Sequence, residues 1–464
     1  MTLPSRLNLV TLCLFLGACS STPPTTPALP APASWQGAHR DLARLDGGWW
    51  RAFASPELDR LIARARANSF DLAAAIARVR QAQASAVIAG APLLPEVKFG
   101  LNASRQRLMR GDGFGGIDAS DKQRTYTAFD STLSATYEID FWGGKAAARD
   151  SALAALEASR YERDTVELTV LSGVANSYLQ SLALSEQVRI ARLNLANARN
   201  VLEVVETRHD AGSATTLELA QQRSLVANQQ RQLPLLEQQL QDSRITLATL
   251  LGDPVQQLQL GGTDFHQLAS PAIGAGVPSD LLTRRPDIAN AEARLAAAQA
   301  NVRVARAAML PSLTLGANLG SGAQHFADIV RSPYYSLTAG LVAPVFNNGR
   351  LAAERDRAQA MQEELLQAYH RVIVSGFADV EQALNGIDGV ERQRAWQDEG
   401  LRQARIAFEI AESRYQAGAE TLLTVLETQR TLYQAQDQQV QLRLARLQGS
   451  VALYKALGGG WTVR

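Results

Sequence analysis

The sequence contains almost no cysteine. Among 464 residues there are only two, Cys13 and Cys19, and both stand near the amino terminus. Cys13 would be removed with a signal segment, so the chain beyond Cys19 has no thiol for a disulfide bond, even in an oxidising compartment. The stability of the mature chain must therefore come from packing.

An excess of charge of either sign is also missing. The chain has 46 basic and 45 acidic residues, which gives a net charge of +1 and does not favour nucleic acid as a partner. Aromatic residues make up only 6% of the chain, whereas Ala, Gln, Leu and Arg are abundant. This composition is more typical of long helices and coiled coils than of a compact enzyme core.

Motifs for catalysis are lacking too. No Cys or Ser nucleophile motif occurs, and the segment 111–116 (GDGFGG) fits a dinucleotide-binding pattern only formally, because no helix follows it. The five histidines have no metal-ligand spacing: His39, His209, His266, His325 and His370. We therefore predict no enzyme activity, no cofactor and no metal site.

The only sustained apolar run lies at the amino terminus. Arg6 and the run that follows it are typical of a signal peptide, which we place at residues 1–18. The Leu-Gly-Ala-Cys sequence ending at Cys19 resembles a bacterial lipobox and implies lipidation of Cys19. Residues 19–54, which begin with a stretch rich in Ser, Thr and Pro, are then a lipidated tether. Ser20 in place of aspartate implies the outer membrane. An ordinary signal peptide with an incidental cysteine is the alternative.

Residues 129–141 show the clearest strand pattern. Apolar residues occupy the odd positions, with Ser131 as the exception, and polar residues occupy the even positions. Taken alone, this pattern fits a half-buried strand of a soluble sheet. No run of 18 apolar residues follows the signal segment, so a mature chain that crosses a membrane must do so as a closed barrel.

Helical patterns surround this strand. One continuous helix is predicted over Pro56–Ala89, followed by a strand at Glu96–Ser104. A second helix without proline begins at Gly144 and reaches about His209, a length of roughly 100 Å. After a turn at Gly212, a helix capped by Thr215 or Thr216 runs to Leu251, with a kink expected at Pro234.

The chain then repeats this pattern. Asp71-Leu-Ala aligns with Asp287-Ile-Ala, and the register holds through the following strand. We assign the first repeat to residues 55–252, a linker to 253–278 and the second repeat to 279–464. The second repeat predicts two strands, the latter at Tyr335–Val345, and a long helix from Gly349 to about Gln416.

Four predicted strands are too few to close a barrel, because the smallest transmembrane barrels have about eight. Open edges in lipid are forbidden on hydrogen-bonding grounds. The strands must therefore be shared between chains, and two, three or four copies would supply 8, 12 or 16 strands. The long and short helices are expected to form a hollow helical cylinder that continues the barrel.

These features resemble the TolC/OprM-type outer-membrane factors, in particular the NodT-like efflux lipoproteins. The resemblance rests on Trp49-Trp50, Phe141-Trp-Gly-Gly-Lys145, Leu282-Thr-Arg-Arg-Pro-Asp-Ile288 and Leu422-Leu-Thr-Val-Leu-Glu-Thr-Gln-Arg430. It implies a mainly α fold with four β-strands per chain, a homotrimer with a shared 12-stranded β-barrel, and a long periplasmic α-helical barrel.

The resemblance also implies a function. It is the outer-membrane channel, or exit duct, of a tripartite efflux or type I secretion system, held in outer-membrane lipid and extending into the periplasm. A periplasmic adaptor protein and an inner-membrane transporter are the implied partners. The alternative is a structural or adhesive outer-membrane lipoprotein without transport.

The family closes its periplasmic end with the helix tips, which implies roles for several residues here. Glu427 stands at the position of a gate carboxylate, and Tyr415 and Glu420 could connect neighbouring tips. Ordinary surface roles are the alternative for all three. Adaptor or pump contacts are implied at the turns of Gly212 and Gly418. The expected junctions between strands and helices involve Trp142, Gly144, Pro344 and Gly349.

Overall fold

A computed structural model describes residues 29–36, 47–107, 109, 113–114, 117–118, 125–271 and 273–462. Contacts divide the chain into the units Met1–Pro32 and Ala33–Arg464. Of the first unit, only residues 29–32 are described, and these have no regular secondary structure. The predicted signal peptide and Cys19 lie outside the described residues. Everything below concerns the second unit.

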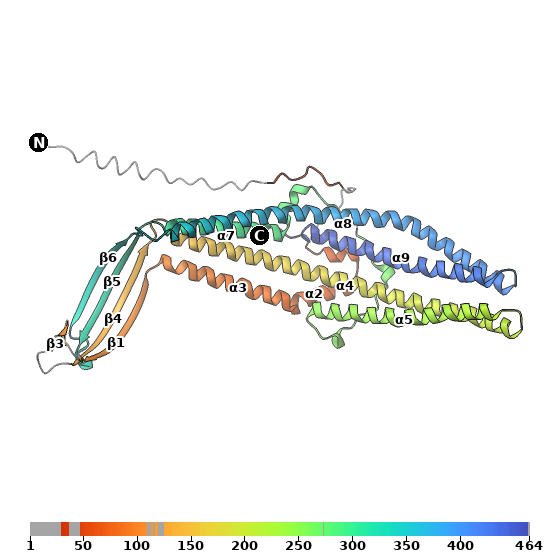
Figure 1. The fold of residues 1–464 in the computed structure, drawn as a ribbon, viewed down its shortest axis with the longest axis horizontal. Helices are drawn as coiled ribbons and strands as arrows, with labels where there is room; N and C mark the ends of the chain where they lie inside the picture. Colours follow the sequence, from red (N-terminus) through yellow and green to blue (C-terminus); the bar gives the residue numbers. More distant parts are fainter. Residues whose placement is uncertain are drawn as a thin grey trace. The chain divides into compact units, whose positions relative to one another are not determined.

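One antiparallel sheet of four strands is present, in the order β1-β4-β5-β6 (Figure 1). Its members are β1 (Glu96–Arg107), β4 (Thr125–Ile139), β5 (Ser312–Ala323) and β6 (Pro333–Val342). The four predicted strands are thus confirmed. The expected end of the last strand at Val345 is wrong, because Pro344 has no N–H to donate and β6 ends before it. In the chain, the short hairpin of β2 (Gly113–Phe114) and β3 (Ile117–Asp118) comes between β1 and β4.

The helices of the first half follow the predicted order. They are η1 (Trp49–Phe53), α2 (Pro56–Asn68), α3 (Phe70–Gly90), η2 (Ala91–Leu93), α4 (Gly144–Asp210) and α5 (Thr216–Leu251). The prediction of one helix over Pro56–Ala89 is wrong. Ser69 has a non-helical backbone (φ −59°, ψ 123°) and separates α2 from α3. α5 is continuous through Pro234, and the expected kink there stays a prediction.

The second half repeats the arrangement. Its helices are η5 (Pro278–Asp280), α6 (Leu281–Arg284), α7 (Pro286–Ala307), η6 (Phe326–Asp328), α8 (Arg350–Gln416) and α9 (Leu422–Ala456). α4 and α8 each have 67 residues, so each rises about 100 Å. The predicted long helices are confirmed at both ends to within a few residues.

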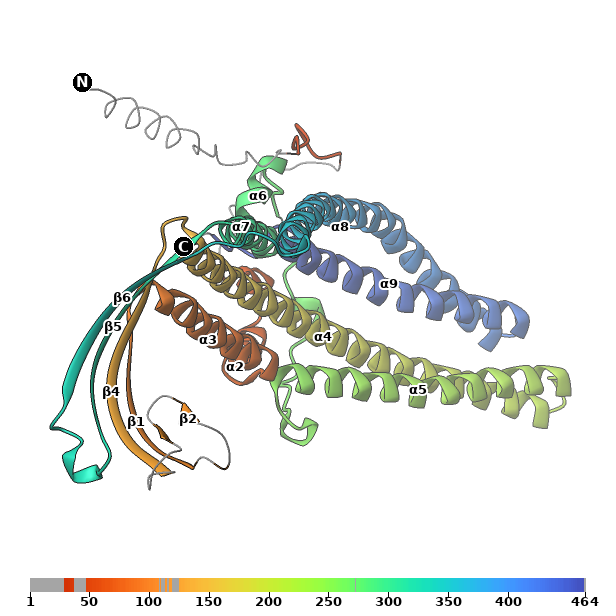
Figure 2. The ribbon, with the colours of Figure 1, turned by 60° about the vertical axis from the view of Figure 1, so that its left-hand side comes forward.

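The short helices lie in line beside the long ones. α3 and α5 both pack against α4, and α7 and α9 both pack against α8 (Figures 1 and 2). α4 also packs against α7 and α9, which joins the two halves. Within the described residues, no helix combines the length and apolar character needed to cross a bilayer.

The largest apolar cluster lies where the short helices meet end to end. Its fully buried members include Phe53, Leu58, Tyr178, Leu251 and Leu447. The segment from Asp253 to Pro278, which contains η3 (Val255–Gln257) and η4 (Phe265–Gln267), contributes buried Phe265 and Leu268 to this cluster. The segment predicted as a linker therefore also covers the helices.

Long-range hydrogen bonds hold this segment down. The Arg443 guanidinium of α9 donates to the carbonyl oxygens of Phe265, His266 and Leu268 at 3.2, 2.7 and 2.9 Å. Glu57 of α2, only 5% exposed, accepts from Thr263 at 2.8 Å and from the Gly261 N–H. We call the segment 253–278, together with the helix surfaces beneath it, the belt.

Candidate functional site

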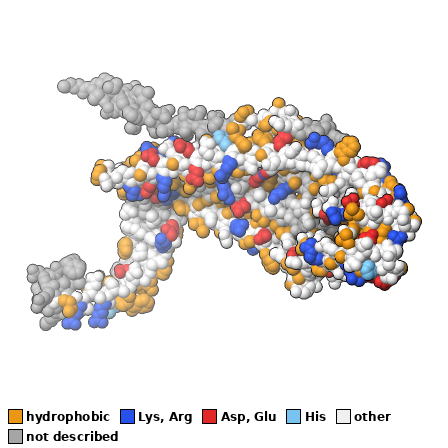
Figure 3. All heavy atoms as spheres, turned by 45° about the vertical axis from the view of Figure 1, so that its right-hand side comes forward, with side chains coloured by type: hydrophobic (Ala, Val, Ile, Leu, Met, Phe, Trp, Pro, Cys, Tyr) orange, Lys and Arg blue, Asp and Glu red, His pale blue; other side chains and the backbone are white. Residues whose placement is uncertain are grey.

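The sheet has one apolar face. Register pairs Phe99 of β1 with Leu133 of β4, Leu133 with Leu319 of β5, and Leu319 with Tyr335 of β6. Directly paired residues point to the same side, so one band of apolar side chains crosses all four strands. Phe99 is 72% exposed, and Leu337, beside Ala317, is 76% exposed. In the view of Figure 3, hydrophobic side chains gather along one margin of the sheet, at the lower left.

The opposite face is polar and, on β5, rich in glycine. Asn102, Asp130 and Gly322 pair in one row, and Ser134, Asn318 and Ser336 in another. The Tyr334 ring lies over Gly320, where a Cβ atom would approach it to 2.6 Å. Oppositely charged residues also form an ion pair on this face: the Lys98 ammonium lies 2.9 Å from the carboxylate of Glu96 on the same strand. Such a surface suits contact with water.

The first junction between strand and helix is built around Asp140. Its carboxylate accepts from the backbone N–H groups of Lys145 at 2.9 Å and Ala146 at 2.7 Å, and so satisfies the start of α4. Gly143 has φ +71°, which lets the chain turn sharply. Gly144 faces α7 so closely that a Cβ atom would lie 2.8 Å from the Ala307 methyl group.

Aromatic side chains mark this junction. Trp142 donates its indole N–H to the Pro311 carbonyl at 2.7 Å and makes an edge contact with Phe141. Both rings are largely exposed, as expected of a junction at a membrane interface.

The second junction is the repeat of the first. Gly349 has φ +79°, as Gly143 does, and the Asn347 side chain accepts from the Leu351 N–H at 3.4 Å. Pro344 lies in the exposed irregular segment between β6 and α8. Val345 and Phe346 are 95% and 87% exposed there, so exposed apolar side chains mark this junction as well.

The two hairpin tips, far from the sheet, share one turn geometry. Gly212 and Gly418 have φ of +71° and +78°. One residue later, the Ser213 N–H donates to the Arg208 carbonyl at 2.8 Å, and the Ala419 N–H donates to the Arg414 carbonyl at 2.8 Å. These are helix C-caps of the left-handed type. The next helix begins at once, with Thr215 and Glu218 forming a capping box.

A cation–π contact joins the two tips of one chain. The Arg208 guanidinium lies 4.5 Å from the centre of the Tyr415 ring and 3.4 Å from the Gln416 carbonyl oxygen. Tyr415 is buried, and its hydroxyl has no hydrogen-bond partner within the described residues. Arg208 was not singled out in the sequence, although the alignment of Glu206–Gly212 with Glu412–Gly418 repeats it as Arg414.

The acidic residues near the tips differ in their surroundings. Glu420 accepts from the Thr421 N–H and the Thr424 hydroxyl, both at 3.1 Å, and these hydrogen bonds lower its pKa. Glu427 is exposed on α9, and its carboxylate makes no ion pair within the part of the chain that the structure describes. The structure therefore groups Tyr415 with Arg208, and Glu420 with Thr424, and leaves Glu427 open to solvent.

Comparison with known proteins identifies the arrangement. The family model described as "Outer membrane efflux protein" matches residues 61–253 and 277–459. The pyoverdine export outer membrane protein OpmQ of Pseudomonas putida KT2440 is 66% identical over 463 residues, covering 99% of this chain and 98% of the relative. OpmQ of Pseudomonas aeruginosa PAO1 is 64% identical over 459 residues, covering 98% and 97%.

Solved structures agree with these matches. The outer-membrane channel OprN superposes with a TM-score of 0.85 at 26% identity, covering 94% of this chain and 99% of that chain. A structure of CusC gives a TM-score of 0.82 at 27% identity with the same coverage. The relatives are channel proteins rather than enzymes. With its four-stranded sheet, paired long helices and match over both halves, the chain belongs to the outer membrane efflux protein family and is an efflux channel of the outer membrane.

Proposed function

We propose that three copies of the chain form an outer-membrane duct for pyoverdine. The choice of pyoverdine as the cargo rests on the sequence identity of 66%, along nearly the whole chain, with a protein named for pyoverdine export. A duct does no chemistry on its cargo, and the work of transport comes from the pump to which it is attached.

The shared barrel follows from the sheet. β1 and β6 each pair on one side only within the described residues, and unpaired edges in lipid leave backbone groups without hydrogen bonds. β6 of one copy pairing with β1 of the next removes both edges, and three copies give the 12 strands implied by the resemblance. The apolar face meets lipid and the polar face lines the lumen.

The proposed duct has two kinds of attachment. Lipidated Cys19 adds an acyl anchor to the barrel in the outer membrane. The tips at Gly212 and Gly418 contact a periplasmic adaptor protein and an inner-membrane transporter. Glu427 of three copies would gather near the axis, where three like charges repel one another and attract cations. Tyr415 and Glu420 stabilise the tips around this gate.

Two measurements test the proposal. In cells without their own pyoverdine export proteins, the chain is expected to restore pyoverdine in the medium when an adaptor and a pump are supplied. In planar bilayers the purified oligomer is expected to conduct ions, with a lower cation preference after Glu427→Gln. If the chain supports no pyoverdine secretion and the oligomer shows no conductance, even with loosened tips, the structural lipoprotein is favoured instead.

A further inference from the structure

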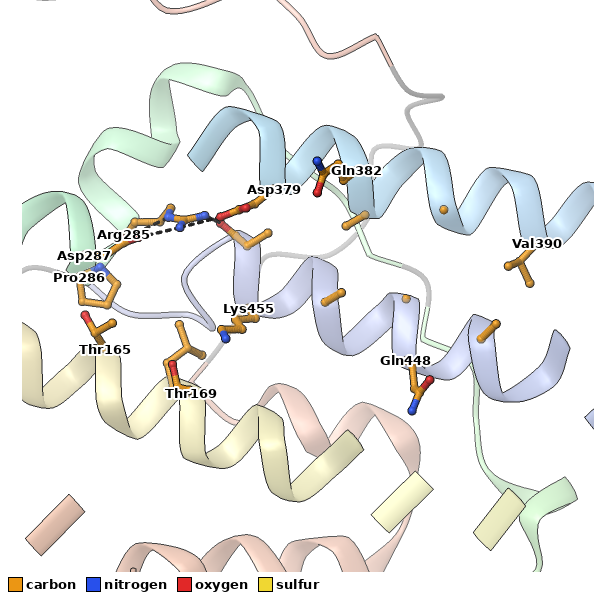
Figure 4. A pocket seen from close by; sticks show the side chains of 17 residues that line it. Thr165, Thr169, Arg285, Pro286, Asp287, Asp379, Gln382, Val390, Gln448 and Lys455 are labelled. Carbon is orange, nitrogen blue, oxygen red and sulfur yellow. Dashed lines mark hydrogen bonds and ion pairs between the residues drawn. The ribbon is translucent and has the colours of Figure 1, made fainter. Parts of the chain in front are cut away.

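Two neighbouring cavities lie along α8 and α9. The first, of about 640 Å³, is lined by Thr169 of α4 and by Gln448 and Lys455 of α9, among others. Figure 4 shows Thr169 and Lys455 on opposite walls of this cavity. The second, of about 850 Å³, lies between Trp396 of α8 and Gln438 of α9. Ala445 lines both cavities, so they adjoin along α9, and the two together are called the groove. Between Gln438 and Lys455 it is about 25 Å long.

The groove opens on the side of α9 away from the belt. Arg443 and Arg446 donate to carbonyl groups of the belt, the latter to Pro271 at 3.1 Å. A step of two residues turns a helix by about 200°, which places Gln441 and Gln448 on the opposite side. In a ring of helices with the belt outside, the groove therefore faces the lumen.

Trp396 is the most unusual residue of the groove. It is 80% exposed, and its indole N–H makes no hydrogen bond within the described residues. A large aromatic ring that is neither buried nor hydrogen-bonded is a platform on which a planar ring can stack. It stands on a helix whose neighbouring residues Arg392 and Gln393 are polar and exposed.

Glutamine amides follow the groove. The Gln397 amide donates to the Ala435 carbonyl at 2.7 Å, and the Gln441 amide donates to Asp437 at 2.6 Å. These bonds hold the two side chains in place and leave their amide oxygens without a donor among the described residues. Gln438 and Gln448 have no hydrogen-bond partner there. Amides both donate and accept, as a peptide backbone does.

Of the positively charged side chains that line the groove among the described residues, Lys455 makes no ion pair. The buried Arg285 lies 2.7 Å from Asp287 and 2.9 Å from Asp379, so its charge is already paired. Arg392 lies 3.0 Å from Asp388. The exposed Lys455 ammonium makes no ion pair within the described residues and is free to meet an anionic group.

We propose that this groove is a binding track for the cargo, a peptide-like molecule that carries a planar ring and an anionic group. The ring stacks on Trp396, the peptide backbone runs along the glutamines, and the anionic group meets Lys455. The inference rests on the proposed export function and specifies where in the duct the cargo makes contact.

Calorimetric titration of the full-length oligomer with pyoverdine tests the track. Trp396→Ala is expected to weaken binding about three- to tenfold through lost stacking, and Trp396→Phe to retain most of the affinity. Lys455→Gln is expected to weaken binding and reduce its salt dependence. Gln439→Ala is the control, because Gln439 donates to Asp398 and does not line the groove.

Three results would overturn the track: no binding to the unaltered oligomer, equal binding by the oligomer with Trp396→Ala, or a smaller oligomer after Trp396→Ala in size-exclusion chromatography. The last would place Trp396 in a subunit interface. Failure of the unaltered chain to restore pyoverdine secretion, with Trp396-dependent binding intact, would overturn the export function and leave the track standing.

Discussion

At the scale of single residues, the polarity of each sheet position decides its tolerance to charge. Leu133 lies on the apolar face, paired with Phe99 and Leu319, and Thr132 lies beside it on the polar face. Leu133→Arg is expected to cost about 2–4 kcal/mol of unfolding free energy per chain near mid-bilayer, and Thr132→Arg far less. Urea unfolding in lipid vesicles measures both. Equal costs would mean that the faces are assigned wrongly.

The pKa of a single buried carboxylate, Glu57 beneath the belt, is also set by its immediate neighbours. Burial raises the pKa of Glu57, but hydrogen bonds from Gly261, Thr263 and Tyr178 outweigh burial and lower it. Burial raises the pKa of Tyr178 to about 12, so its hydroxyl keeps the proton that it donates to Glu57 at 2.9 Å.

The sign of the pH dependence follows. Because the folded pKa of Glu57 lies below the unfolded one, its stabilisation is complete above the unfolded pKa and is lost as pH falls through the folded pKa. Glu57→Gln is expected to cost about 1–3 kcal/mol at neutral pH and to flatten the decline of the thermal midpoint in acid. Scanning calorimetry from pH 7 to about 3 measures this. The exposed Glu203→Gln should leave the decline unchanged, and an equally steep decline in Glu57→Gln would contradict the assignment.

At the scale of elements, two helix ends with the same backbone geometry have different surroundings. Gly252 ends α5 with φ +73° and Gly212 ends α4 with φ +71°. A Cβ atom at position 252 would lie 2.4 Å from the Asn68 carbonyl oxygen, whereas position 212 has open space.

Alanine substitutions at Gly212 and Gly252 distinguish the cost of backbone strain from the cost of a steric clash. Gly212→Ala is expected to cost about 1–2 kcal/mol, the strain of a left-handed alanine, and Gly252→Ala clearly more, because α5 must move away from α2. Urea unfolding monitored by circular dichroism gives both values. Equal losses would show that the contact with Asn68 relaxes freely.

Element boundaries were predictable where a local signal marks them. Thr215, Gly252 and Gly349 end or begin helices through their own side chains or backbone freedom, and the structure places these ends as predicted. Asn68 and Ser69 are residue types that favour helix ends, but Ser69 makes no side-chain capping bond to α3, and the break there was missed. The covering of the helices by the belt was missed too, because it depends on Arg443, far away in the chain.

At the scale of the whole molecule, the tips are expected to determine whether the duct is open. Arg208 joins the two tips of one chain through Tyr415. Arg208→Ala removes a contact of about 0.5–1 kcal/mol, so the open fraction of single channels should rise about two- to fivefold. Arg223→Ala is the control, because Arg223 pairs with Glu206 and not with Tyr415. An unchanged open fraction in Arg208→Ala would exclude this contact from gating.

The two proposed membrane attachments are expected to be separable. Cys19→Ala is expected to abolish acylation and leave the protein in the outer-membrane fraction, because the apolar face of the sheet holds it there. Mass spectrometry of the amino-terminal peptide and membrane fractionation measure the two effects. Release into the soluble periplasm would mean that the sheet does not anchor the chain by itself.

The sequence by itself determined the four strands, the polarity of their faces, the two repeats and the lengths of α4 and α8. These depend on periodicity and on turn residues, which act locally and are readable along the chain. Only the tertiary structure decided the contact of Arg208 with Tyr415, the burial of Glu57 under the belt and the groove with Trp396. Each of these needs side chains from distant helices at a particular rotation, and helix rotation is set by packing across the whole fold.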